Sequence, residues 1–509
     1  MEFYELFYDW VPKWVRLSFL TLTYTLLLIA NGVYPGNIIA ASSNLGVYTE
    51  PYIASYNAVY IGIALGFLIS FRIRSRFTNK GLLLFSLVML LLTNVVCTST
   101  NSPELTVLTC LVLGATKVPG VVELFFRWLN IWSKNQDTSK LYPFVYFSAL
   151  GGIYANAWLT AQIAYRYDWR YANIILLVLI LFSIIGTILF AEAHPLKHKV
   201  PLYQMDWTGL VLLASACMLL NYVIVYSKVE DGLVSDKIKA AIFVLTICFL
   251  LFIKRELRLK RPLLDLNFFK LPSFRLGLFL FFLIGIFTPL TLQNTFTFSG
   301  LKYENISTWE VALFMIPGIF AGATICYYWY YRSYSPHLLI IIGFSLGVCH
   351  YAIMYHNYGV NFAMQQFWVP SILKGMSLSI LFTSIGLYFT HGHTLPNVLA
   401  VVGAGILIRS FLGTGVFTSI YTYFLYAQKI RHLEYLSGLI DANVFQSDKF
   451  QAPGVYTDTI QLQASLNAAK EITGDMVILG ILIIIFLTIR LLYLYNKRLR
   501  PFHTVQIWD

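Results

Sequence analysis

Residues 61–96 read IGIALGFLISFRIRSRFTNKGLLLFSLVMLLLTNVV. No charge occurs at residues 61–70 or 82–96, whereas four of the nine residues from Arg72 to Lys80 are positive. An apolar run of about 20 residues is long enough to cross the hydrocarbon core of a membrane as a helix. A short basic stretch between two such runs is typical of a connection on the cytoplasmic side. The stretch therefore predicts a transmembrane helical hairpin.

The composition extends this prediction to the whole chain. Of the 509 residues, 58% are hydrophobic and 12% are charged, and the mean hydropathy is +0.68. Soluble domains carry about 25% charged residues, so this chain lacks the polar surface that water requires. Its net charge of +12 favours basic loops at a membrane and not a nucleic-acid partner. We expect an all-α integral membrane protein in contact with the lipid bilayer.

Fourteen apolar runs are long enough to span a membrane. An even number places both termini on one side. With the termini in the cytoplasm, about 22 of the 36 Lys and Arg residues fall on the cytoplasmic side. The charge distribution therefore predicts cytoplasmic termini, and we expect the protein in a bacterial inner (cytoplasmic) membrane.

Four motifs follow one another along these runs. Asp168–Tyr171 (DWRY) opens the sixth run and Asp206–Leu210 (DWTGL) opens the seventh. Pro262–Leu266 (PLLDL) precedes the ninth, and Arg409–Gly415 (RSFLGTG) lies in the thirteenth. In this order the motifs resemble the fourteen-span drug:proton antiporter branch of the major facilitator superfamily, the EmrB/QacA type. The resemblance implies the major facilitator fold, with two six-helix bundles plus two extra helices.

The resemblance also divides the chain into parts. They are an N-terminal six-helix bundle at 17–193, two additional transmembrane helices at 205–256, an amphipathic cytoplasmic linker at 257–273, and a C-terminal six-helix bundle at 274–498 with an outer loop at 428–472. The linker mixes basic residues with leucine and phenylalanine, which is typical of a segment that lies on the inner leaflet.

The basic stretch aligns with the family's loop between spans two and three. The resemblance implies a role in gating for Arg72, Ser75, Arg76 and Lys80, together with Arg409 of the thirteenth run. In the family an Asp of this loop helps to hold one conformational state. Ser75 stands at that position and cannot supply the charge. We expect the corresponding contact to be weaker or to be made differently.

Charged residues deep in the apolar runs are functional candidates because a charge at mid-bilayer costs roughly 2.5–3.5 kcal/mol on insertion scales. Lys117 and Lys374 lie in the runs that the superfamily places around a central cavity. We predict that they bind substrate from opposite bundles, with Gln293, Asn294 and Asn31 as further polar contacts. A lysine that snorkels or pairs internally is the competing interpretation.

A proton antiporter needs a carboxylate that exchanges protons, and acids are scarce in the runs. The candidates for proton coupling are Glu310 and Glu123, neither of which is central. Glu123 is four residues from Arg127, a spacing that also predicts a local ion pair. Deep cations without a deep acid favour a cavity for anions, so we expect the substrate to carry a carboxylate, sulfate or phosphate group.

The leading hypothesis is a secondary active transporter, an efflux protein for small amphipathic or anionic organic compounds that works by alternating access. The resemblance also makes a periplasmic adaptor and an outer-membrane channel conceivable partners. Two alternatives stay open: a polytopic enzyme acting on lipid-linked substrates, and a transport-incompetent relative. For the enzyme, the nearest signal is His391-Gly392-His393, which more commonly forms a polar turn. The six cysteines lie in apolar runs without ligand spacing, and no metal or cofactor is expected.

Overall fold

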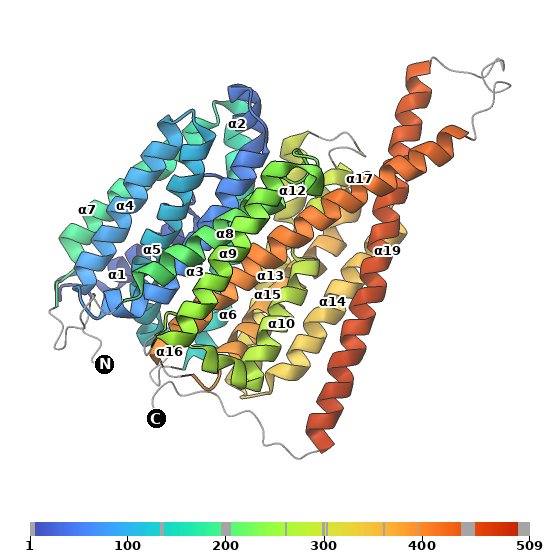
Figure 1. Cartoon of the computed structure of the whole chain (residues 1–509). Coiled ribbons are helices and arrows are strands. Elements are labelled where there is room, and N and C mark those ends of the chain that lie inside the picture. Colours follow the sequence, from blue (N-terminus) through green and yellow to red (C-terminus); the bar gives the residue numbers. More distant parts are fainter. Residues whose placement is uncertain are drawn as a thin grey trace.

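The computed structural model describes residues 6–132, 137–194, 205–259, 262–297, 301, 304–359, 362–393, 395–438 and 453–496. Within these ranges the backbone is almost wholly helical, and an isolated β-bridge joins Phe7 to Ala191. The helices lie side by side in one elongated bundle (Figure 1). The first helix begins and the last one ends at the same face, the lower one in Figure 1. We call it the terminal face, and its counterpart the opposite face.

The first half of the chain supplies the blue to cyan helices of Figure 1. Their bounds are α1 Lys13–Ile29, α2 Ile38–Leu45, α3 Glu50–Arg74, α4 Asn79–Ser99, α5 Pro103–Trp132, α6 Thr138–Arg166 and α7 Arg170–Phe190. Two helices follow, α8 Trp207–Tyr226 and α9 Asp236–Arg258.

The second half contains several interrupted helices. Their bounds are α10 Pro272–Phe287, α11 Thr291–Thr295, α12 Asn305–Leu313, α13 Met315–Tyr331, α14 Pro336–Asn357, α15 Trp368–Thr390, α16 Leu395–Ile406, α17 Thr414–Gly438 and α19 Pro453–Asn496. A π-helical turn, Leu407–Gly413, joins α16 to α17.

Each of the fourteen predicted spans contains helix in the described ranges, and some are interrupted. Eleven of them are long and apolar enough to cross a membrane. The other three are α1, which stops after 17 residues, and the more polar α6 and α9. An all-helical membrane protein is therefore confirmed, and the number fourteen stays a prediction.

The two halves meet where α6 packs on α12, α13 and α15, and where α3 packs on α16. The hairpin α8–α9 lies across this boundary in front of α3 and α17 (Figure 1). Asn221 of α8 donates to the Ala54 carbonyl of α3 at 2.9 Å, and Ser419 of α17 donates to the Ile224 carbonyl of α8 at 3.3 Å. The two extra helices thus contact both halves.

The DWTGL motif has a structural role at the start of α8. Asp206 accepts a hydrogen bond from the Gly209 amide at 2.9 Å, which caps the helix, and it pairs with Arg255 of α9 at 2.8 Å. Glu256 then accepts the amides of Leu263 and Leu264, which belong to the PLLDL motif. The two motifs therefore join the α8–α9 hairpin to the chain that leads into α10.

Two predicted segments contain helical structure. The outer loop 428–472 is largely helical in its described parts, because α17 continues to Gly438 and α19 already begins at Pro453. No proline or glycine interrupts residues 416–437, so the helix extends beyond its apolar part. The linker 257–273 contains the short 3₁₀ turn Leu266–Lys270, and its position on the inner leaflet stays a prediction.

Glycines allow α3 and α5 to approach closely. A Cβ atom at Gly62 of α3 would lie 2.2 Å from the Leu111 carbonyl oxygen, and one at Gly114 of α5 would lie 2.2 Å from that of Val59. Small residues at helix crossings permit such backbone contact in membranes, where lipid offers no hydrophobic force between helices. This contact positions α5, which carries Lys117, against α3.

We predict that Gly114→Ala destabilises the fold by roughly 1–3 kcal/mol, because the added methyl group has no space. Gly151→Ala on α6 is the matched control, since its Cβ would meet nothing nearer than 3.9 Å. The denaturation temperature in detergent should fall for the first variant and not for the second. Equal denaturation temperatures for Gly114→Ala and the unmodified protein would contradict this packing.

Candidate functional site

A cavity of about 240 Å³ lies between the two halves. Helices α1, α3, α5 and α6 line it from the first half, and α13, α15, α16 and the π-helical turn from the second. It extends from Asn31 and Lys117, in the middle of the bundle, to Ser139 and Thr390, near helix ends at the terminal face. Most of its lining side chains are aliphatic or aromatic. Five of them are tyrosines: Tyr24, Tyr60, Tyr142, Tyr146 and Tyr330.

Lys117 brings a positive charge to the wall of this cavity. Its side chain is 2% exposed, and its ammonium donates to Asn31 Oδ1 at 2.5 Å and to the Ala30 carbonyl at 3.5 Å. These acceptors belong to residues 30–37, the non-helical segment that separates α1 from α2. Gly32 has a φ of +75°, which favours glycine, and Pro35 cannot donate a backbone hydrogen bond.

Other polar side chains satisfy the remaining carbonyls of this break. Asn156 of α6 donates to Ile29, Asn173 of α7 to Gly32, and Asn305 of α12 to Gly36, at 3.4, 3.4 and 3.2 Å. The Cys110 thiol donates to Asn31 O at 3.7 Å. Sequence reasoning did not single out these donors. An isolated asparagine in an apolar run could have indicated them, because such a residue needs a hydrogen-bond partner inside the membrane.

Arg409 is the second cation of the cavity. It lies on the π-helical turn, and its guanidinium donates to the Tyr146 hydroxyl at 3.2 Å and stacks 4.4 Å from the Phe382 ring. π-Helical turns are rare and occur frequently at functional sites. The prediction gave Arg409 a gating role, and the structure brings its side chain into the same cavity as Lys117.

Carboxylates are absent from the described lining of the cavity. Neither proton-coupling candidate lies there: Glu310 is half-buried on α12, and Glu123 belongs to the ion-pair network described next. The cavity therefore presents two cations and several hydroxyl and amide groups in an apolar wall.

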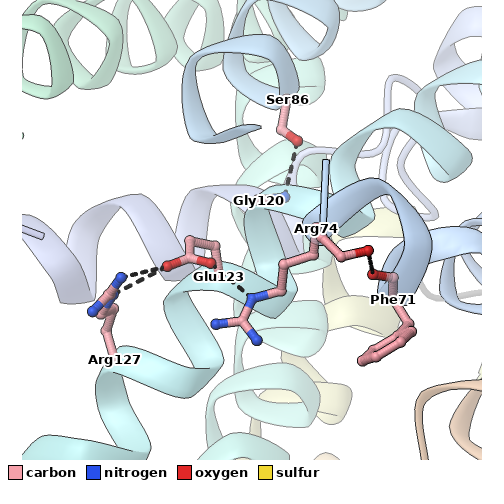
Figure 2. A network of polar contacts seen from close by, with 7 residues as sticks. Phe71, Arg74, Ser86, Gly120, Glu123 and Arg127 are labelled. Carbon is pink, nitrogen blue, oxygen red and sulfur yellow. Dashed lines mark hydrogen bonds and ion pairs between the residues drawn. The ribbon is translucent and has the colours of Figure 1, made fainter. Parts of the chain in front are cut away.

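Glu123 of α5 is fully buried and holds two arginines (Figure 2). Arg127 Nη2 lies 2.8 Å from one oxygen, as the i,i+4 spacing predicts, and Arg74 Nε of α3 lies 3.1 Å from the other. The Arg74 guanidinium also lies 4.3 Å from the ring centroid of Phe126, a lining residue of the cavity. The network thus links the end of α3 to the cavity wall.

The predicted gating residues of the basic stretch lie around the end of α3. Ser75 Oγ donates to the carbonyls of Phe71 and Arg72, so it ends the helix and makes no charged contact. Lys80 donates to the Ile188 carbonyl of α7 at 2.9 Å, and Arg76 is exposed. The carboxylate that the loop lacks comes from Glu123, which the sequence analysis paired only with Arg127.

Lys374, Gln293 and Asn294 lie outside this cavity. Lys374 is 3% exposed and donates to the Pro289 carbonyl at 2.9 Å, in the gap between α10 and α11. Proline at 289 interrupts the helix and frees acceptors that a neighbouring donor can satisfy. In this structure Lys117 lines the cavity and Lys374 does not, so the two lysines do not face one site here, and their binding of substrate stays a prediction.

Of the two histidines in the α15–α16 connection, His393 lines the cavity at its terminal-face end. His393 packs its ring against Phe268 and Phe274, with centroids 5.1 and 6.1 Å apart. Burial, and then the nearby His391, lower the pKa of His393, so its imidazole is neutral at neutral pH. Among the described residues, no group of three His, Cys, Asp or Glu side chains could hold a metal ion. These contacts fit a structural turn.

No family model matches the chain. Over 128 residues it is 30% identical to the lincomycin resistance protein LmrB of Listeria innocua serovar 6a and to that of Listeria monocytogenes serovar 1/2a. The match covers 23% of this chain and 26% of each relative, so it spans about a quarter of the relatives' length.

Solved transporter structures share the fold over most of the chain. Tetrameric PepTSo2 has a TM-score of 0.57 at 14% identity, with 94% of this chain and 98% of that chain covered. The human organic anion transporter MFSD10 (TETRAN) has a TM-score of 0.51 at 12% identity, with 93% and 100% covered. At these identities the likeness concerns the fold alone. The chain therefore shares the fold of these transporter structures over most of its length.

We predict that Glu123→Gln lowers stability by about 3–5 kcal/mol, because it removes the buried carboxylate that pairs with the guanidinium groups of Arg74 and Arg127. Asp236→Asn is the control, since Asp236 pairs with Lys239 at 3.1 Å on the exposed start of α9. Thermal denaturation in detergent should separate the two variants. If Glu123→Gln and Asp236→Asn denature at the same temperature, the network does not stabilise the first half.

Proposed function

We propose that this protein is a secondary transporter that moves small amphipathic organic anions across a membrane by alternating access. The observation that carries the proposal is the cavity between the two halves, where Lys117 and Arg409 face a described lining without any carboxylate. A buried cation without an anionic partner is costly. An anionic substrate supplies the missing charge when it binds.

The rest of the lining fits such a substrate. Tyrosine hydroxyls and the ammonium and guanidinium groups donate hydrogen bonds, and charge-assisted bonds are the strong ones. Aliphatic and aromatic walls favour an apolar body, as in most small-molecule sites. The cavity volume of about 240 Å³ limits the substrate, in this conformation, to a small organic molecule.

The shape of the cavity supports alternating access between two faces. It approaches the terminal face at Ser139 and Thr390. Towards the opposite face the halves are in contact: Asn305 of α12 bonds the Gly36 carbonyl, and α12 packs on α6. Two bundles around a central site are the arrangement in which rocking exposes the site to each side in turn.

The proposal also covers the direction of transport and the membrane in which the protein lies. The partial match with lincomycin resistance proteins favours efflux, and basic connections at the terminal face favour cytoplasmic termini in a bacterial inner membrane. Proton flow is not assigned to Glu310 or Glu123, because neither lines the cavity and Glu123 is held by two arginines. The adaptor and outer-membrane channel gain no support from the comparisons.

The test is flux in proteoliposomes with fluorescein as an anionic probe and ethidium as a cationic one, with and without a pH gradient. We expect saturable flux of fluorescein and not of ethidium. Lys117→Gln and Arg409→Gln should each raise the KM for fluorescein about tenfold or more, since a bond to a charged group contributes about 1.5–3 kcal/mol.

Lys239→Gln, an exposed lysine of α9, is the control and should transport like the unmodified protein. Flux of ethidium without fluorescein would overturn the proposed substrate class. Unchanged KM values in both cavity variants would show that the two cations do not bind the substrate.

A further inference from the structure

The same arrangement of lysine and broken helix occurs in both halves. Lys117 of α5 donates to the Ala30 carbonyl, where α1 ends, and Lys374 of α15 donates to the Pro289 carbonyl, where α10 ends. The intervals Lys13–Ala30 and Pro272–Pro289 contain the same number of residues, so each break follows the start of its helix by the same distance along the chain. The halves therefore place a buried ammonium at equivalent points of their first long helices.

The two copies differ in what surrounds them. Lys117 lines the cavity, whereas Lys374 does not. The part of α15 that lines the cavity, Leu387 and Thr390, follows Lys374 by thirteen residues or more, roughly 20 Å along a helix. Lys374 lies less than two turns from the start of α15, whereas Leu387 and Thr390 lie at its end.

Lys374 has spare bonding capacity in a buried position. An ammonium has three donors. Besides the Pro289 carbonyl, its described surroundings include the Tyr351 ring, 6.0 Å away, and the buried His350, whose Nδ1 bonds the Pro370 carbonyl. No carboxylate pairs with Lys374 among the residues that the structure describes. A charge in this state costs free energy unless an anion joins it.

Unsatisfied polar groups lie on the same two elements. Ser371 precedes Lys374 by three residues on α15, so the two share a helix face, and its buried hydroxyl has no hydrogen-bond partner among the described residues. Gln293 of α11 follows Pro289 by four residues and is 4% exposed, and within the same described part of the chain neither its amide oxygen nor its amide nitrogen is paired. Each such group costs about 1–3 kcal/mol when it stays unpaired.

We propose that Lys374, Ser371 and Gln293 form a second anion site, closed in this structure, that binds the charged group of the substrate when the protein opens to the opposite face. The inference rests on the proposed function of anion transport. The ammonium, hydroxyl and amide N–H donate to the oxygens of a carboxylate, sulfate or phosphate group. The substrate then contacts one lysine of each repeat in turn, Lys374 on one side and Lys117 on the other.

The experiment compares membrane vesicles of the two orientations, right-side-out and everted, made from cells that produce the full chain. Initial uptake of fluorescein gives a KM for each face. Lys374→Gln should raise KM at least about tenfold in one orientation and less than about twofold in the other. Lys117→Gln should show the larger effect in the other orientation.

Gln293→Leu separates binding from a purely structural role. It removes unpaired polar atoms and leaves the Lys374–Pro289 bond in place, so the fold should be retained. On the proposal its KM rises several-fold in the same orientation as that of Lys374→Gln. Lys239→Gln is the control and should not change either KM.

Three results are distinguishable. No fluorescein uptake by the unmodified protein in either orientation would overturn the proposed function itself. Uptake with equal effects of Lys374→Gln in both orientations would show that Lys374 only caps the broken helix, which overturns the second site. Unchanged KM values in Gln293→Leu, with a higher denaturation temperature, would also overturn it.

Discussion

The backbone break between α1 and α2 is the constraint on which the arrangement of the first half depends. In hydrocarbon no water can satisfy a free carbonyl, so each must find a donor inside the protein. Here the donors come from four other helices, with Lys117 on α5, Asn156 on α6, Asn173 on α7 and Asn305 on α12. The break thereby holds α5, α6 and α7 around α1, and Asn305 extends this contact to the second half.

The same constraint explains why charge is tolerated in the cavity. Lys117 donates to Asn31 and Ala30, and Arg409 donates to Tyr146 and Ser410. These acceptors are neutral, so they leave the charge of both cations uncompensated. An anionic substrate is the complement that these contacts lack, whereas Glu123 already compensates Arg74 and Arg127.

The order of helices was predictable because apolar length is a local property of each segment. Two features were not predictable from the sequence: the break at residues 30–37 and the helices in the described parts of 428–472. A long apolar run that contains glycine can be continuous or broken, and a polar segment can be a loop or a helix. The Arg74–Glu123 pair was also missed. It joins residues 49 positions apart, and sequence spacing identifies only partners on one helix, such as Glu123 and Arg127.

By itself, the sequence determined that this chain is a helical membrane protein, because the length and charge of each run decide where it can lie. It also singled out Lys117 and Lys374 as cations in the membrane, but it could not distinguish them. Only the tertiary structure placed Lys117 in the cavity with Arg409 and buried Lys374 outside it, against the Pro289 carbonyl. The reason is that helix breaks, helix rotation and the contact between the halves decide what each side chain faces.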